Sequence, residues 1–232
     1  MKPVYLQGKQ AVLLDMNSTF MFGEDRFDST QDYSLVYRQL GGNLPAAQVN
    51  RLIRDVMDYL TPRYPAAEYQ EAFPSIPAAL KAMSNTPLSD AEMSTLAMTF
   101  AMHERGHIPP AYVQALHQLA THFRLGLVID IWAAKDLWEQ YFRETGIHHL
   151  FEAVSFSSDH GCVKPSPYGF RQILQAMRLQ PEDALFIGDS VRRDLGGAQA
   201  AGLDCVLVGG AESAQAIAAY PDLLSLCCDW FG

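Results

Sequence analysis

Five short apolar runs divide the chain, and each ends in a polar or small residue. They are AVLLD (11–15), LGLVID (125–130), AVSF (153–156), ALFIGD (184–189) and DCVLVGG (204–210). Runs of this length without alternation are typical of strands buried on both faces, as in a parallel sheet. Helical patterns at 135–146, 166–179 and 191–202 separate the later runs. This alternation predicts an α/β fold, a Rossmann-like parallel-sheet core with helices on both faces.

The segment between the first and second runs is too long for a single crossover. It contains no convincing strand and instead carries helical patterns at 32–40, 45–60, 67–73, 74–83 and 89–104. Ser89 and Glu92 fit a capping box at the start of the last one. We therefore expect an inserted α-helical domain with hinges at Gly23 and Pro109–Pro110. The predicted domains are a core of residues 1–18 and 111–232 and a helical insert of residues 19–110.

Charge and composition exclude some classes of function. The 232 residues carry a formal net charge of −9, which argues against binding to nucleic acid. No apolar run approaches the roughly 20 residues that span a bilayer, and the N-terminus lacks the apolar centre of a signal peptide. The four cysteines form no CxxC pair. We therefore expect a protein without membrane partners in a reduced, cytoplasmic setting.

The candidate chemistry lies where the predicted strands end. Asp15, Asp130 and Asp189 end apolar runs, while Lys164 follows the run at 153–156 and Asp194 follows Asp189. In a doubly wound sheet, functional groups gather at the C-terminal ends of the strands. Carboxylates in one cleft repel each other unless a cation lies among them, and hard oxygen ligands favour Mg²⁺. A carboxylate, a Mg²⁺ ion and a lysine can together promote phosphoryl transfer through an aspartyl intermediate.

Four segments in this order resemble the motifs of the haloacid dehalogenase superfamily of hydrolases. LLDMNST resembles its first motif, Asp-x-Asp-x-Thr after a strand, and LGLVID stands where the second motif places a strand ending in Ser or Thr. VKPSPYGF resembles the third motif, and FIGDSVRRDLGGAQAAG resembles the fourth. The helical insert resembles the cap of the first cap class of that superfamily. The resemblance covers almost the whole chain.

The resemblance implies a role for each matching residue. Asp15 would be the nucleophile and a Mg²⁺ ligand, together with the backbone carbonyl of Asn17. Asp189 would bind the metal directly and Asp194 would lie nearby, with water between. Lys164 would neutralise the nucleophile and the substrate phosphate, and Thr19 matches the threonine of the first motif. The implied activity is Mg²⁺-dependent hydrolysis of a small phosphomonoester.

Two departures from the family pattern bear on that activity. Asn17 replaces the second acid of the first motif, which in family phosphatases protonates the leaving group and then activates water. The second motif lacks its hydroxyl, because Ile129 or Asp130 occupies the position; we favour Ile129. One hypothesis is that Asp130 supplies the proton that Asn17 cannot. The alternative is that Asp130 is a strand-end acid that faces solvent or caps the following segment.

The departures leave three functions open. The first is a phosphatase slowed by its missing acid, since general acid–base catalysis is worth roughly 10² to 10⁴ in rate. The second is a protein that has lost turnover and binds a phosphorylated ligand or a partner. The third is hydrolysis of a carbon–halogen or carbon–phosphorus bond, although the fourth motif counts against a dehalogenase.

Each candidate residue also has a purely structural alternative. Asp15 could cap the next turn, Lys164 could be a solvated loop residue, and Asp189 and Asp194 could be carboxylates at a helix N-terminus.

The sequence HERGH, residues 103–107, matches the H-E-x-x-H zinc signature. Gly106 inside it and the prolines after it predict that the helix ends before His107, which disfavours a zinc site.

Overall fold

The computed structural model describes residues 3–232, and its centre is a six-stranded sheet in the order β3-β2-β1-β4-β5-β6. The strands are β1 (Ala11–Leu14), β2 (Arg124–Ile129), β3 (Phe151–Phe156), β4 (Ala184–Gly188), β5 (Asp204–Leu207) and β6 (Ala218–Ala219). Every neighbouring pair is parallel. The predicted α/β fold with a Rossmann-like sheet is therefore confirmed.

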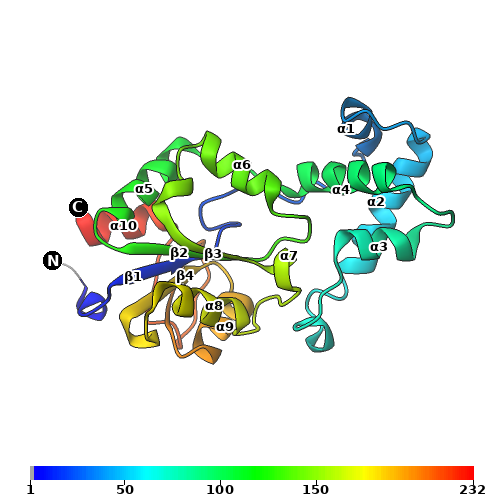
Figure 1. Ribbon diagram of the computed structural model, residues 1–232. Coiled ribbons are helices and arrows are strands. Elements are labelled where there is room, and N and C mark those ends of the chain that lie inside the picture. Colours follow the sequence, from blue (N-terminus) through cyan, green and yellow to red (C-terminus); the bar gives the residue numbers. More distant parts are fainter. Residues whose placement is uncertain (1–2) are drawn as a thin grey trace.

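Helices cover both faces of the sheet (Figure 1). One face carries α5 (Pro110–Ala120), α6 (Asp136–Glu144) and α10 (Leu223–Phe231), and the other carries α8 (Tyr168–Met177) and α9 (Gly196–Ala200). The sequence of β1 explains this arrangement, because Val12 and Leu14 are buried in the first layer while Ala11 and Leu13 are buried in the second. The shorter elements are η1 (Val4–Leu6), η3 (His148–Leu150), α7 (Ser157–His160), η4 (Pro181–Asp183) and the π-helical turn η5 (Val191–Leu195).

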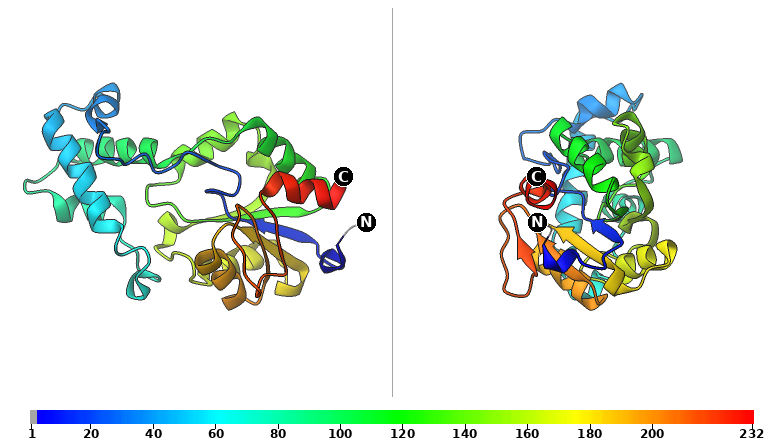
Figure 2. Two further views of the ribbon diagram at one scale, coloured as in Figure 1. Left: turned by 180° about the vertical axis from the view of Figure 1, so that it is seen from behind. Right: turned by 90° about the vertical axis from the view of Figure 1, so that its left-hand side faces the viewer.

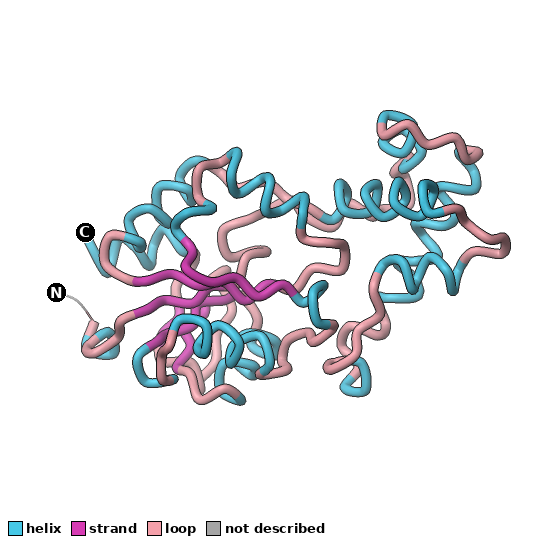
Figure 3. Tube along the Cα trace, viewed as in Figure 1, coloured by secondary structure: helices cyan, strands magenta, loops and turns pink. Residues whose placement is uncertain are grey.

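A group of helices beside the sheet makes up most of the chain between β1 and α5. It consists of α1 (Tyr33–Gln39), α2 (Ala46–Leu60), η2 (Ala67–Tyr69), α3 (Ile76–Met83) and α4 (Asp90–Glu104). We call residues 23–106 the helical insert; Figures 2 and 3 show it beyond one end of the sheet, away from both chain termini. Helix α4 begins with the expected capping box of Ser89 and Glu92. Among residues 3–232, no helix is both long and apolar enough to cross a membrane.

The helix predicted over residues 67–73 is reduced to the single turn η2. The backbone of this segment makes only two turn-like hydrogen bonds within residues 67–73, and it also bonds to the core. Gln70 accepts a hydrogen bond from the N–H of Val163 at 2.8 Å, and Phe73 donates to the carbonyl of Gly161 at 2.7 Å. Docking of the insert on the core therefore overrides the local helical pattern.

Two linkers that join the insert to the core run side by side. Phe22 and His107 exchange backbone hydrogen bonds of 2.8 and 2.9 Å as an antiparallel bridge. A Cβ atom on Gly106 would approach the carbonyl oxygen of Phe22 to 2.6 Å, so only glycine allows this approach. Arg26 ties the same junction, because its guanidinium donates to the carbonyls of Gly23 and Arg105 at 2.9 and 2.7 Å.

The H-E-x-x-H segment forms this junction and leaves no free ligand pair. His103 is buried, and its Nδ1 lies 2.8 Å from the carbonyl of Thr99. His107 is exposed beyond the end of α4, as the sequence predicts. Glu104 turns to the core and accepts hydrogen bonds from the N–H groups of Trp132, at 2.5 Å, and Ala133, at 2.9 Å. Glu104 therefore fastens α4 to the loop after β2.

Substitution of Glu104 tests this attachment through pH. Burial raises the pKa of Glu104 to about 8, and the two N–H donors lower it only in part. The folded state therefore holds a proton that the unfolded state releases near pH 4.5, so ionisation costs stability as pH rises toward 8. We expect the free energy of unfolding of Glu104→Gln to rise relative to that of the wild type by about 1 kcal/mol per pH unit in that range. Chemical denaturation from pH 5 to 8 measures this difference.

The matched control is Glu144→Gln, because Glu144 is exposed and bonds only to Gln140. The difference in free energy of unfolding between this variant and the wild type should not change with pH. A flat difference for Glu104→Gln as well would contradict a buried, costly carboxylate at this junction.

Candidate active site

Lys164 lies at the centre of a buried ionic cluster at the C-terminal edge of the sheet. Its Nζ donates to Oδ1 of Asp15 at 2.5 Å and to Oδ1 of Asp194 at 2.7 Å, and the residue is only 3% exposed. Burial alone would lower the pKa of Lys164, but the carboxylates of Asp15, Asp194 and Asp130 raise it above its usual range. A fixed positive charge therefore stands against Asp15, and the solvated-loop alternative for Lys164 is wrong.

Asp15 follows β1 directly and keeps the sheet geometry at that point. Its N–H donates to the carbonyl of Ile187 on β4 at 2.9 Å, and its side chain is 7% exposed. Thr19 Oγ1 lies 3.5 Å from Oδ2 of Asp15, so the threonine of the first motif turns back to the acid. Burial raises the pKa of Asp15 to about 7, against the lowering effect of Lys164. Asp15 therefore points into a buried site and does not cap the next turn.

Asp194 is completely buried and organises the segment after β4. Its Oδ2 accepts hydrogen bonds from the N–H groups of Asp189 and Ser190 at 3.0 and 2.9 Å, while Oδ1 binds Lys164. Both oxygens are thus engaged by donors of the protein. Asp194 holds Asp189 and Lys164 in place.

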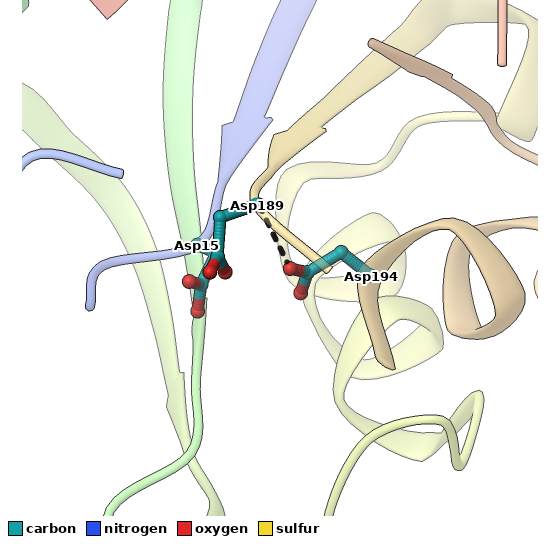
Figure 4. Close-up of side chains that lie close together, drawn as sticks. All are labelled: Asp15, Asp189 and Asp194. Atoms are coloured by element: carbon teal, nitrogen blue, oxygen red, sulfur yellow. Dashed lines mark hydrogen bonds between the residues drawn. The ribbon is translucent and has the colours of Figure 1, made fainter. Parts of the chain in front are cut away.

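Asp15, Asp189 and Asp194 together fit a divalent cation. One carboxylate oxygen of each lies within 4.8 Å of the others, and Figure 4 shows the three carboxylates around a common space. Oδ1 of Asp189 is buried without a hydrogen-bond partner among residues 3–232, and burial with the nearby Asp194 charge raises the pKa of Asp189 to about 6. Hard oxygen donors, one of them without a hydrogen bond, match the preference of Mg²⁺. The residues present therefore fit the metal that the sequence predicts.

Asn17 lies at the same edge with unused acceptors. Its side-chain Oδ1 is buried without a partner, and no described residue donates a hydrogen bond to its backbone carbonyl. A buried unpaired oxygen costs free energy unless a bound group satisfies it. Asn17 can therefore offer an oxygen to a ligand, but no titratable proton.

The backbone N–H groups of residues 131–133, just after β2, all donate within the protein. Ile131 donates its N–H to Ser157 Oγ at 3.0 Å, and the next two N–H groups bind Glu104. Ile129 is buried and apolar. At this edge the side chain of Ile129 offers no hydroxyl, and the three N–H groups of residues 131–133 are already engaged.

Asp130 neither faces solvent freely nor caps the following segment. Its Oδ2 accepts hydrogen bonds from the Tyr64 hydroxyl of the helical insert at 2.7 Å and from the N–H of Lys164 at 3.0 Å. The structural alternative considered for this acid is therefore wrong in both its forms. Asp130 connects the insert to the ionic cluster.

Two residues of the site were not found from the sequence. Arg193 brings a second cation, with Nη2 3.8 Å from Oδ1 of Asp189 and its guanidinium 5.7 Å from the centre of the Tyr64 ring. Its place beside Asp194 in the fourth motif was an available signal. Tyr64 had no such signal, because the docking of the insert alone brings it to Asp130.

Comparison with known proteins shows the family of this chain. The profile of the haloacid dehalogenase-like hydrolases matches residues 9–202, which include all four motif segments. The chain belongs to this family.

The curated relatives of this hydrolase include named phosphatases. It is 36% identical over 100 residues to the glyceraldehyde 3-phosphate phosphatase of Methanopyrus kandleri, covering 43% of this chain and 42% of that one. It is 33% identical over 130 residues to the phosphoserine phosphatase of Thermus thermophilus, covering 55% and 51%. The chain therefore spans about half the length of these relatives.

Solved structures of the same fold cover nearly the whole chain. A haloacid dehalogenase-family phosphatase from Thermococcus onnurineus aligns with a TM-score of 0.62 at 20% identity, over 94% of this chain and 95% of that one. A 2-haloacid dehalogenase from Pseudomonas syringae aligns with a TM-score of 0.59 at 21% identity, over 94% and 96%. At such identities the likeness shows the shared fold.

Gly188 gives a test of how tightly the site is built. A Cβ atom there would lie 2.5 Å from Cγ of Asp194, whose carboxylate is fixed by its hydrogen bonds. We expect Gly188→Ala to displace Asp194 and to lower the free energy of unfolding by about 1–3 kcal/mol, as overpacked buried sites do. Denaturant unfolding measures the change.

Gly196 is the matched control. It has helical backbone angles, and the nearest atom to a Cβ there, Pro165 Cβ, is 3.7 Å away. Gly196→Ala should be neutral or stabilising by up to about 1 kcal/mol. Equal stability of the two variants would mean that Asp194 is free to move.

Proposed function

We propose that this hydrolase is a Mg²⁺-dependent phosphatase that acts on a small phosphomonoester through an aspartyl-phosphate intermediate. The supporting observation is the ammonium of Lys164 held between Asp15 and Asp194, near Asp189, whose buried Oδ1 has no hydrogen bond. A nucleophilic carboxylate, a fixed cation and an oxygen-rich metal site then meet at one edge of the sheet. These are the groups that phosphoryl transfer to a carboxylate requires.

Asp15, the backbone carbonyl of Asn17 and Asp189 are the proposed metal ligands, with Asp194 in their outer shell. A bound Mg²⁺ ion would neutralise charge on the transferring phosphoryl group. The outer position of Asp194 is supported by its engagement with Lys164 and two N–H groups.

The residues of the chain divide the remaining work. Asp15 attacks phosphorus, and Lys164 favours the ionised form of that carboxylate and attracts the substrate phosphate. Thr19 steadies Asp15. Arg193 adds positive charge on the side of the insert, and the second motif, with Ile129, lacks its hydroxyl. Water then attacks the aspartyl phosphate and releases inorganic phosphate.

The proposed substrate class is a small phosphorylated molecule. The names of the curated relatives, glyceraldehyde 3-phosphate phosphatase and phosphoserine phosphatase, support it. The insert would select the substrate and exclude water, because Tyr64 reaches the site from it.

A second candidate function is binding of a phosphorylated ligand or partner without turnover. Asn17 favours it, since this residue has no proton to give. The N–H groups of residues 131–133 favour it too, because they already donate hydrogen bonds within the protein. Hydrolysis of a carbon–phosphorus bond is less well supported. It would require a lysine of the insert to form a Schiff base, and Lys81, its one lysine, is exposed on α3.

A panel of phosphomonoesters, assayed with Mg²⁺ and with a chelator, tests the leading function. We expect turnover that requires Mg²⁺ and falls to background in Asp15→Asn, because the amide cannot attack phosphorus. Asn17→Asp should raise the rate by about 10²-fold, since it places an acid–base group at this position.

Other outcomes separate the candidates. Turnover that survives in Asp15→Asn contradicts the nucleophile. Tight binding of phosphorylated ligands without turnover by either the wild type or Asn17→Asp favours the binding protein. Chelator-resistant release of halide from a haloacid would favour a dehalogenase.

A further inference from the structure

The missing proton of Asn17 raises a question about the proposed phosphatase reaction. When the ester P–O bond breaks, the leaving alkoxide needs a proton, and water must later lose one to attack the aspartyl phosphate. Neither Lys164 nor Arg193 suits this task, because acidic neighbours raise the pKa of each far above neutrality. The inference below rests on the proposed function and names the group that handles this proton.

Asp130 follows β2 at the C-terminal edge of the sheet, the same edge at which Asp15 and Asn17 follow the adjacent strand β1. Strands β1 and β2 pair in parallel with Leu14 opposite Leu127, and three further residues along each chain lead to Asn17 and Asp130. In an extended chain, side chains two residues apart point to the same face of the sheet. Val128 and Leu13 are buried on one face, and Asp130 and Asp15 each come two residues after them. The carboxyl group thus stands on the face of the nucleophile, nearer to the insert.

The contacts of Asp130 leave one oxygen available. Oδ2 accepts from the Tyr64 hydroxyl and from the N–H of Lys164, at 2.7 and 3.0 Å. Oδ1 has no hydrogen bond to any residue in the described part of the chain, and it is not among the fully buried unpaired atoms. A proton can therefore reside on Oδ1 while Oδ2 still accepts both bonds.

The surroundings of Asp130 favour its protonated form over that of an ordinary aspartate. Burial raises its pKa, and Asp194 adds to this effect. The ammonium and N–H of Lys164 and the hydroxyl of Tyr64 act in the opposite direction without cancelling it. A raised pKa makes a carboxylic acid better able to hold a proton that it can give to a leaving group and later recover.

We propose that Asp130 is the proton donor and acceptor of the reaction, and that Tyr64 positions it. In the first step Asp15 forms a bond to phosphorus, the ester P–O bond breaks, and the Oδ1 proton passes to the leaving oxygen to give the alcohol. In the second step the Asp130 carboxylate takes a proton from water as water bonds to phosphorus and the Asp15–phosphorus linkage breaks. Inorganic phosphate leaves, and the site returns to its starting protonation.

Tyr64 links this proton to the docking of the insert. Its ring packs edge-on against Phe73 and Trp132, with centroids 5.7 and 5.6 Å away, and lies under Arg193. Only with the insert docked on the core does the hydroxyl reach Asp130. The acid is therefore fully positioned only when the site is closed.

Two substrates with different leaving groups test the proposal on the full chain. p-Nitrophenyl phosphate releases a stable anion that needs little protonation, whereas an alkyl phosphate such as glycerol phosphate releases a strongly basic alkoxide. We expect Asp130→Asn to lower kcat/KM for the alkyl phosphate by about 10²- to 10⁴-fold and to change that for p-nitrophenyl phosphate far less. Rapid mixing of this variant with p-nitrophenyl phosphate should release a burst of p-nitrophenol close to the enzyme concentration, because water attack becomes slow.

The control is Asp159→Asn, an exposed carboxylate on α7 that pairs with Lys135. It should leave both substrates unaffected. Equal losses on both substrates in Asp130→Asn would assign this residue a structural role and overturn the proposal, as would no loss on either. If the wild type hydrolyses no phosphomonoester, or turnover survives in Asp15→Asn, the proposed function itself fails.

Tyr64→Phe is the second variant, which removes one hydroxyl and keeps the ring contacts. Because the Tyr64 hydrogen bond lowers the pKa of Asp130, its loss should move the alkaline fall of kcat/KM for the alkyl phosphate to higher pH. The profile for p-nitrophenyl phosphate should not move. Identical shifts for both substrates, or none, would argue against Tyr64 acting through Asp130.

Discussion

The ammonium of Lys164 is the interaction on which the site and its surroundings depend. It lies between two buried carboxylates from opposite parts of the chain, one after β1 and one in η5. Removal of one partner of a buried ion pair typically costs 3–5 kcal/mol, because the remaining charge is left without compensation. Asp194 extends this constraint to the N–H groups of Asp189 and Ser190. The buried charge, the turn after β4 and the nucleophile are thus one unit.

The insert contacts the core at separate places with different chemistry. Glu104 binds the loop after β2, Gln70 and Phe73 pair with the core backbone, and Tyr64 reaches Asp130. Only the last of these contacts involves a residue of the candidate site. The first two contacts fix the position of the insert. The hydrogen bond from Tyr64 to Asp130 therefore depends on polar contacts that lie outside the candidate site.

Local patterns in the sequence predicted most of the fold, because buried parallel strands have continuous apolar runs and the insert has helical periodicity. The prediction was wrong where tertiary contacts decide the outcome. Residues 67–73 lose their helix to backbone pairing with the core, and β6 is too short to leave a pattern. Lys164 and the acids were recognisable because motif spacing encodes them. Tyr64 was not, because its partner Asp130 is 66 residues away and no spacing rule connects them.

The backbone pairing of Phe22 with His107 has a consequence for how this architecture can diverge. Both connections to the insert pass through one narrow point, so the intervening segment has its ends fixed side by side whatever it contains. A different set of helices could join at this point without disturbing β1 or β2. Selection can then exchange the recognition surface as a module, while the ionic chemistry beneath it is inherited unchanged.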